Sequence, residues 1–579
     1  MIQKQTYKKC NSIISILIIV FIVCVAVLFP QVRQMIFGFL AEHVIHKETP
    51  INPIWNEIFF KFAITGIFFI LFFIYCIFTG SGKLLVEKVK QEINDCIAEI
   101  DFRSLLKPSL ILFGVYLLGI LTIIRANFLY KDDVWRATEG LRVWINWSRY
   151  ITEFFSIFVH ADTNLTEISP LTQLLAIFLI SVSSVLLVYI LTRKITVIRL
   201  LASIPLGLFP YFLECLSYKF DSIYMALSVF VCIFPFLFIA RKKAFLLVSI
   251  ISLLIMCMTY QPSSGIYMLI VVILCFQYWN RKEKSNKEIL SFLGLSAFAF
   301  CFAMLFFRFF LMKPVSSDDV YAFTTMHPIS QIISGTLNNI INYAKIINND
   351  LGVIWKIGIV LVLLFFITKA IHMTAQKKIF SFFASILFIV LSFILSYGVY
   401  SLLALPLFYP RALYGFGVFL AIMCIYIVSD YKKIAVISVL ALNWCFLVFA
   451  FSYGNALADQ KRYREFRIGL LLNDLNTLNL EQGEEKKLIQ IDNFIEFTPL
   501  VKNIAKHYPV IEKLVSYKLN DFTDYFYFLI YFNYDQFSIE YAMKHNIVDF
   551  NDLNLPVVLD SYYHTIQSDG NRVLIVLKR

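Results

Sequence analysis

Residues 108–136 read PSLILFGVYLLGILTIIRANFLYKDDVWR, and this stretch decides the kind of protein. Its first part, 108–124, is almost purely apolar and approaches the roughly 20 residues that a helix needs to cross a bilayer. Asp132 and Asp133 follow closely after the end of that segment. Carboxylates at a membrane edge are expensive to desolvate and can act as acid or base. The pair is therefore the first candidate for chemistry.

The composition extends the membrane character to the whole chain. Of its 579 residues, 59% are hydrophobic and 16% are charged, and the mean hydropathy is +0.74. Soluble proteins have roughly 25% charged residues, so a polytopic α-helical membrane protein is predicted. The net charge of +12 does not indicate nucleic-acid binding, because the basic residues cluster in short loops between apolar segments. The eleven cysteines lack the spacing of a metal site or a disulfide framework.

Thirteen apolar segments are predicted to span the membrane. They cover residues 12–29, 57–79, 108–124, 171–192, 197–213, 223–240, 244–260, 262–279, 289–311, 352–371, 379–402, 412–429 and 434–452. Basic residues recur in every second connecting loop, which predicts a cytoplasmic N-terminus and an extracytoplasmic C-terminus. The first segment could instead be a signal peptide, but no small-x-small cleavage site follows it.

This topology divides the chain into three predicted parts. They are a two-span extension over 1–104, a transmembrane catalytic module over 105–452 and a tail over 453–579. The tail is predicted to be a small extracytoplasmic α/β domain, with strands near 487–492 and 572–577 around a helix near 500–515. We see no catalytic motif in it, which favours a cap or an acceptor-binding module over a second enzyme.

The acidic pair has two interpretations. Asp132 or Asp133 could deprotonate an acceptor hydroxyl as a general base, and two like charges close together raise one pKa. Both could instead cap a helix. The loop that follows shows Arg136, Gly140, Trp144 and Trp147 at spacings of three and four, and this pattern predicts an amphipathic helix at the headgroup interface. Such a helix either engages a lipid-linked substrate or serves only as an anchor.

Further polar residues stand at the predicted external ends of other spans. Glu214, Lys219 and Asp221 end the fifth span; Lys219 could neutralise a phosphate, or the group could be snorkelling interfacial side chains. Arg411 follows a proline and could grip a phosphate. Asp318 begins a second acidic pair with Asp319, which competes for a catalytic or metal role. The scattered histidines predict no metal site, and we see no glycine-rich phosphate loop.

In their order along the chain, these motifs resemble the GtrII-type family of serotype-converting, O-antigen-modifying glucosyltransferases. The resemblance covers about residues 105–430. It is carried by Asp132, Asp133, Arg136, Glu214, Ser217, Tyr218, Phe220, Asp221, Ser222, Tyr260 and Gln261. The chain departs from the family pattern in two extra spans before the acidic pair and in its long tail.

The resemblance implies a GT-C-type fold in the bacterial cytoplasmic membrane, with catalysis at the extracytoplasmic face. It implies transfer of a sugar, most commonly glucose, from polyprenyl phosphate (typically undecaprenyl phosphate) to an envelope glycan such as the O-antigen of lipopolysaccharide. Inversion by direct displacement follows, without a metal or other cofactor. A polyprenyl-phosphate sugar synthase and a flippase are the expected functional partners.

On this hypothesis one aspartate is the base and the other orders it, with a preference for Asp133. The donor phosphate is assigned to Lys219, Arg136 and Arg411. Substrate binding is assigned to Glu214, Tyr218, Asp221, Tyr260, Gln261 and Arg149. The alternative is a transporter or flippase for a lipid-linked saccharide, which would need polar residues at mid-membrane and paired repeats. The sequence shows few charges inside the spans and no clear repeat.

Overall fold

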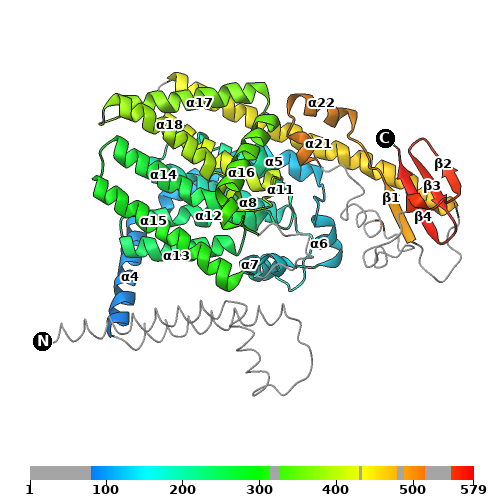
Figure 1. Ribbon diagram of the computed structural model, residues 1–579, viewed down its shortest axis with the longest axis horizontal. Helices are drawn as coiled ribbons and strands as arrows, with labels where there is room; N and C mark the ends of the chain where they lie inside the picture. The colour runs from blue at the N-terminus through cyan, green and yellow to red at the C-terminus, as the bar shows by residue number, and fades with distance from the viewer. Residues whose placement is uncertain are drawn as a thin grey trace, which may run out of the picture.

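The computed structural model describes residues 80–312, 325–429, 433–478, 488–515 and 550–578, together with Phe532. The long helices form one bundle, and a small sheet stands apart from it at one end (Figure 1). Seven helical segments of the described chain are long and apolar enough to cross a membrane. They are α5 (Phe102–Ala126), α8 (Leu171–Thr192), η4 with α14 (Gln261–Asn280), α15 with η5 (Asn286–Leu311), α17 (Val353–His372), α18 (Lys378–Leu395) and α21 (Lys433–Thr477).

The count of thirteen spans is not confirmed. The segment predicted over 197–213 is a broken one, with α9 and α10 (Val197–Leu208) bent by 62° against α11 (Pro210–Ser217). Pro210 starts the second piece, since proline suits a first helical position but not a helix interior. Three other predicted spans fall on helices of 17 residues or fewer, namely α12 with η3 (Ser222–Phe238), α13 (Lys242–Cys257) and α20 (Gly415–Val428). The first two predicted spans lie outside the described residues.

The loop after α5 is not the single amphipathic helix that the sequence predicts. It consists of α6 (Asp133–Glu139), η2 (Trp144–Trp147) and α7 (Tyr150–His160). Gly140 ends α6 in a left-handed conformation with φ of +65°, which glycine adopts without steric cost. The remaining described helices of the bundle are α4 (Gly80–Glu99), η7 (Ile329–Gln331), α16 (Ile332–Asp350), η8 (Gly398–Leu402) and α19 (Pro410–Leu413).

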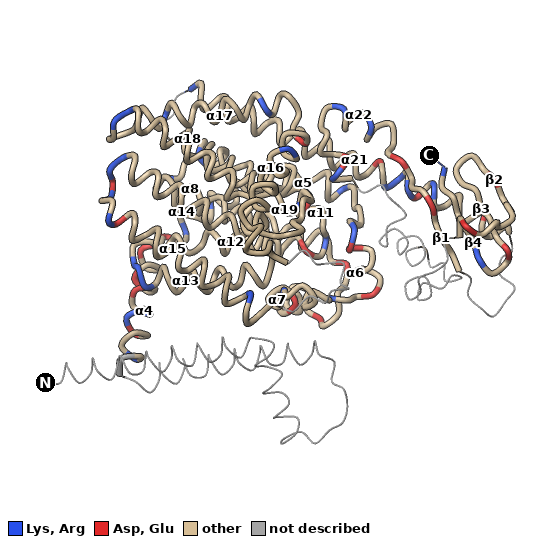
Figure 2. Tube along the Cα trace, in the orientation of Figure 1, with Lys and Arg blue, Asp and Glu red and all other residues tan. Residues whose placement is uncertain are grey.

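The core of the bundle is built around α5, which packs along both α8 and α21. Gly454 of α21 lies directly against Thr122 of α5, where a Cβ atom would collide with the threonine side chain. The Thr122 hydroxyl donates a hydrogen bond to the Ala450 carbonyl at 3.2 Å. Charged residues gather at the two ends of the long helices, and the middle of the described bundle is nearly free of them (Figure 2). This distribution matches helices that cross an apolar layer, and the protein is a membrane protein.

The tail is continuous with the bundle. Helix α21 runs through the predicted boundary at 452 and carries at its far end a four-stranded sheet of order β1-β4-β3-β2 (Figure 1). The strands are β1 (Leu488–Asp492), β2 (Val557–Asp560), β3 (His564–Ser568) and β4 (Arg572–Leu577), with β1 parallel to β4 and the other pairs antiparallel. Both predicted strands are thereby confirmed. Helices α22 (Pro499–His507) and α23 (Ile511–Leu514) occupy the predicted helical region, and η9 (Phe550–Asp552) precedes β2.

Candidate active site

The two adjacent aspartates differ in burial. Asp132 stands just before α6, is exposed and makes no side-chain capping bond. Asp133 is 0% exposed. Its Oδ2 accepts hydrogen bonds from the peptide N–H of Tyr130 at 2.9 Å and of Lys219 at 3.0 Å, and its Oδ1 accepts a second contact from Lys219 N–H at 3.1 Å. Asp133 therefore ties the loop after α5 to the turn after α11.

Burial has a clear consequence for Asp133. It raises the pKa of this carboxyl to about 8, although the two backbone N–H groups act in the opposite direction. The side chain is thus held largely protonated at neutral pH and is enclosed by protein. Neither property suits a base that must meet a substrate hydroxyl. Asp132 retains both access to solvent and electrostatic interaction with Lys131 and Arg411.

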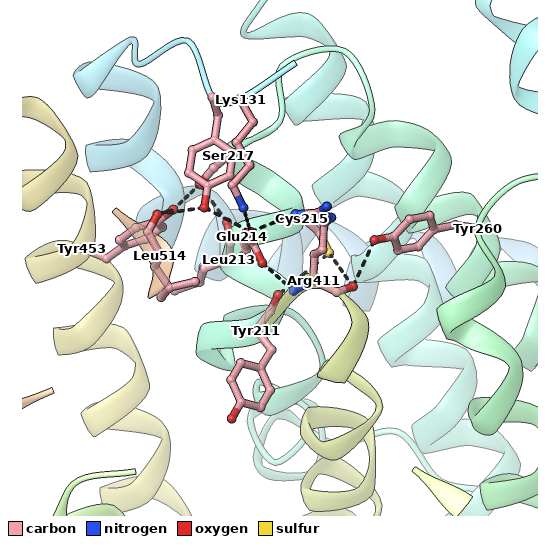
Figure 3. A network of polar contacts seen from close by, with 11 residues as sticks. Lys131, Tyr211, Leu213, Glu214, Cys215, Ser217, Tyr260, Arg411, Tyr453 and Leu514 are labelled. Atoms are coloured by element: carbon pink, nitrogen blue, oxygen red, sulfur yellow. Dashed lines mark hydrogen bonds and ion pairs between the residues drawn. The ribbon is translucent and has the colours of Figure 1, made fainter. Parts of the chain in front are cut away.

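Glu214 is the centre of a buried polar network (Figure 3). Its Oε1 accepts hydrogen bonds from the Lys131 ammonium at 2.7 Å and from the Tyr130 hydroxyl at 3.1 Å. Its other oxygen accepts from the Arg411 peptide N–H, and the Arg411 guanidinium lies 3.6 Å from Oε1. The carboxylate is 0% exposed, whereas the two cations are each about one quarter exposed. Glu214 therefore fixes two cations whose outer sides remain open.

Aromatic rings surround the Arg411 guanidinium. Its centre lies 4.9 Å from the Tyr409 ring and 5.7 Å from the Tyr218 ring. The Tyr260 hydroxyl donates to the Arg411 carbonyl at 3.1 Å, at the opposite end of the network from Tyr453 (Figure 3). Arg411 Nη1 is buried and makes no hydrogen bond to the described residues. Nη1 faces the Glu214 carboxylate, so the exposed part of the Arg411 side chain, in its aromatic setting, is the part suited to an anionic oxygen of a ligand.

Asp221 organises a second cluster beside the first. Its Oδ1 accepts from the Trp144 indole N–H at 2.6 Å, and its Oδ2 lies 3.3 Å from Arg136 Nε. Arg136 is 2% exposed and stacks on Trp144 at 4.1 Å. Arg149 Nη1 is 3.9 Å from Asp221, and its guanidinium lies 4.9 Å from the Tyr260 ring. Arg136 thus belongs to the interior of the fold, while Arg149, one fifth exposed, links the two clusters.

Gln261 and Lys219 have positions that the sequence did not predict. The Gln261 side chain donates to the Cys257 carbonyl at 2.8 Å and is half-buried at the start of η4. Lys219 Nζ contacts Glu167 Oε2 at 2.6 Å and Asn127 Oδ1 at 2.5 Å, away from Arg411. Burial alone would raise the pKa of Glu167, but the hydrogen bond and charge of Lys219 hold it below the ordinary value.

Several groups of this site were not predicted from the sequence. Lys131 immediately precedes the acidic pair, and this position in the sequence could have identified it as a site residue. Glu167 is an isolated acid in the same loop, between α7 and α8. The third group comes from the tail, where the Leu514 carbonyl accepts from the Tyr130 hydroxyl at 2.8 Å and from Tyr453 at 3.4 Å (Figure 3). No sequence signal pointed to that carbonyl, because any residue carries one.

The tail also packs against α6, the helix that begins at Asp133. Val134 of α6 is buried in one apolar cluster with Leu471 of α21 and Ile566 and Ile575 of the sheet. Lys513 forms an ion pair of 2.5 Å with Asp350 at the end of α16. The tail is therefore packed against α6 at one place and against the end of α16 at another.

The candidate metal role of Asp318 and Asp319 falls on residues outside the described chain. Among the residues that are described, no three His, Cys, Asp or Glu side chains stand close enough to hold a metal ion. A metal-independent reaction stays a prediction.

Comparison with known proteins gives the site its context. Residues 121–422, which include the acidic pair, Glu214, Asp221 and Arg411, match the family model described as "Glucosyl transferase GtrII". The chain is also similar to the "Uncharacterized 55.3 kDa protein in gtrB 5'region" of Salmonella phage P22, at 21% identity over 443 residues, which cover 71% of this chain and 87% of the phage protein. No solved structure matches the chain. The matched region spans half of the chain, and the protein belongs to the GtrII family of glucosyl transferases.

Proposed function

We propose that this glucosyltransferase moves glucose from a polyprenyl-phosphate donor to an envelope glycan such as O-antigen, by direct inverting displacement at the extracytoplasmic face of the bacterial cytoplasmic membrane. Family membership supports the transfer of glucose. The apolar helices and the cationic, aromatic site at one end of the bundle support a lipid-carried donor. We further propose a GT-C-type fold, no metal, and dependence on a sugar synthase and a flippase that supply the donor.

The single observation that carries the mechanism is the unequal burial of the acidic pair. Asp132 is the exposed carboxylate within electrostatic range of Arg411, so we assign it as the general base. Asp133, with both oxygens bonded to backbone N–H groups, positions the loop that carries Asp132. This reverses the preference that the sequence alone suggested.

The reaction needs one base and one stabilised leaving group. The acceptor oxygen attacks the anomeric carbon and loses its proton to Asp132, and a new carbon–oxygen bond forms with inverted configuration. The bond from that carbon to the phosphate oxygen breaks, and polyprenyl phosphate leaves with the electron pair. Arg411 and Lys131, with Arg149 beside Tyr260, stabilise the charge that develops on the phosphate.

The surface next to Arg149 suits the lipid part of the donor. Arg149 immediately precedes α7, on which Phe154, Phe155 and Phe158 are exposed and contact one another edge-on or tilted. An exposed aromatic cluster beside a cation is typical of helices that lie in a membrane interface. We propose that the first isoprene units of the donor lie against this cluster while its phosphate reaches Arg149 and Arg411.

Reconstituted transfer tests the function. The full chain in proteoliposomes is supplied with radiolabelled polyprenyl-phosphate glucose and envelope polysaccharide, and label in the polysaccharide is counted. The proposal requires transfer from this donor, none from a nucleotide sugar, and an anomeric configuration in the product opposite to that of the donor. Movement of the labelled lipid between leaflets without transfer would indicate a flippase, and retention of configuration would exclude direct displacement.

A further inference from the structure

A cavity of about 280 Å³ lies beside the acidic pair, apart from the Arg411 cluster. It is lined by the C-terminal end of α5, the start of α8, the turn after α11 and the middle of α21, and it is partly open. Half of its lining is polar, from Asn127, Ser169, Gln173, Ser217 and Lys219, and half is apolar, from Ile123, Ile124, Phe128, Pro170 and Leu457. The proposed transfer reaction assigns no role to this cavity.

The charges in the cavity are balanced. Lys219 is 5% exposed, and its ammonium is bonded to the Glu167 carboxylate at 2.6 Å and to Asn127 Oδ1. Two cations stand outside the lining: Lys461 donates to the Asn127 carbonyl, and Arg125 donates to an asparagine side chain on α21. A phosphate placed against Lys219 would meet the carboxylate of Glu167 and would have to displace it. The lining therefore favours a neutral polar ligand.

The chemistry of the lining matches a sugar ring. The lining supplies an ammonium, two amides and hydroxyl groups, and the Glu167 carboxylate is bonded to the Lys219 ammonium beside them. Together these groups offer both donors and acceptors to several hydroxyls at once. The apolar side, with the Phe128 ring, offers a surface for the C–H face of a pyranose. Ligand pockets for drug-sized molecules usually measure roughly 300–1,000 Å³, so this smaller cavity fits a single sugar residue.

The turn after α11 connects the cavity with the transfer site. Ser217 and Lys219 line the cavity, while the ring of Tyr218, between them in sequence, faces Arg411 on the other side. The peptide N–H of Lys219 is held by Asp133, the neighbour of the proposed base. A sugar bound in the cavity would therefore lie across this turn from the donor phosphate, with the acidic pair alongside.

We infer that this cavity binds one neutral pyranose residue of the acceptor glycan, an inference that rests on the proposed glucosyl transfer. Lys219, Glu167 and Asn127 form hydrogen bonds with its hydroxyls, and Phe128 contacts its apolar face. Lys219 thus has an acceptor-binding role in place of the donor-phosphate role that its sequence position suggested.

Kinetics with both substrates varied test the assignment. Lys219→Met removes the ammonium, and Ser169→Trp fills the cavity. Lys502→Met, the matched control, breaks the exposed ion pair between Lys502 of α22 and Glu496. Each of the first two is expected to raise the acceptor KM about tenfold or more and to change the donor KM by less than about twofold. The control should change neither. A rise in the donor KM instead, or an unchanged acceptor KM, overturns the inference.

Binding without donor separates this inference from the proposed function. The melting temperature of the full chain in detergent is measured with about 50 mM methyl glycosides of glucose, galactose, mannose and rhamnose, and with glucuronate and inorganic phosphate. At least one neutral glycoside is expected to stabilise the wild type and the Lys502→Met protein but not the Ser169→Trp protein. Stabilisation by the anions alone, by nothing, or equally in Ser169→Trp overturns the cavity assignment. A chain that binds a glycoside here but transfers no glucose would refute only the proposed transfer.

Discussion

Substitution of each aspartate of the acidic pair by asparagine should produce opposite effects on activity and stability. Asp132→Asn removes the charge of an exposed side chain that makes no capping bond. Asp133→Asn alters a fully buried carboxyl whose Oδ2 alone accepts from two backbone N–H groups, at 2.9 and 3.0 Å. An asparagine oxygen in the place of Oδ2 keeps both of those acceptor contacts.

The structure gives a magnitude for each change. Asp132→Asn should change the free energy of unfolding by less than about 0.5 kcal/mol, since exposed substitutions away from special features rarely do more. The loss of a general base should lower kcat by about 10²- to 10⁴-fold. Asp133→Asn should cost about 1 kcal/mol below pH 4, where the wild-type carboxyl is protonated in both the folded and the unfolded state. It should keep kcat within about tenfold, because the backbone contacts persist. Asp133→Ala leaves two buried N–H groups without an acceptor and should cost about 2–6 kcal/mol.

The assay pairs glucose transfer in proteoliposomes with thermal unfolding in detergent, followed by tryptophan fluorescence. Both are measured on the same preparation of each variant, so that lost activity can be corrected for lost folded protein. Asp132 is not the base if Asp133→Asn abolishes transfer at an unchanged melting temperature while Asp132→Asn remains active. It also fails if Asp133→Ala is as stable as the wild type.

Three further outcomes are expected. Burial raises the Asp133 pKa from 3.8 to about 8. The contribution of the protonated carboxyl to the free energy of unfolding is therefore complete below pH 4 and falls by about 1.4 kcal/mol per pH unit as pH rises toward 8. Unfolding in detergent at pH 6 and 8 should show this loss in the wild type but not in Asp133→Asn. Arg411→Met should lower kcat/KM for the donor about 10²- to 10³-fold through loss of phosphate stabilisation, while Arg142→Met, which removes a surface arginine of similar exposure, leaves donor kinetics unchanged. Gly454→Ala should destabilise the protein by about 1–3 kcal/mol because its Cβ meets α5, whereas Gly469→Ala on the same helix, with open space around it, should be neutral or stabilising by roughly 0.5–1 kcal/mol in the same thermal assay.

Residue type and spacing were sufficient to predict the membrane bundle, two strands of the tail and the family. In lipid, the backbone N–H and C=O groups of a long apolar segment are hydrogen-bonded within the segment when it forms a helix. The long apolar segments of the sequence therefore predicted a bundle of membrane helices. Short segments rich in Ile, Val and Leu predicted β1 and β4, because such segments are typical of strands. The family resemblance rested on Glu214, Asp221 and the acidic pair, and the family match covers these residues.

The tertiary structure alone decided which of these residues remain available for chemistry. Asp132 and Asp133 are chemically identical and adjacent, and only the packing of the loop against the turn after α11 buries one and leaves the other exposed. The same holds for the cations: Arg136 is enclosed with Asp221, Lys219 is neutralised by Glu167, and Arg411 keeps an open side. Burial and ion pairing depend on partners far apart along the chain, and a linear pattern carries no record of such partners.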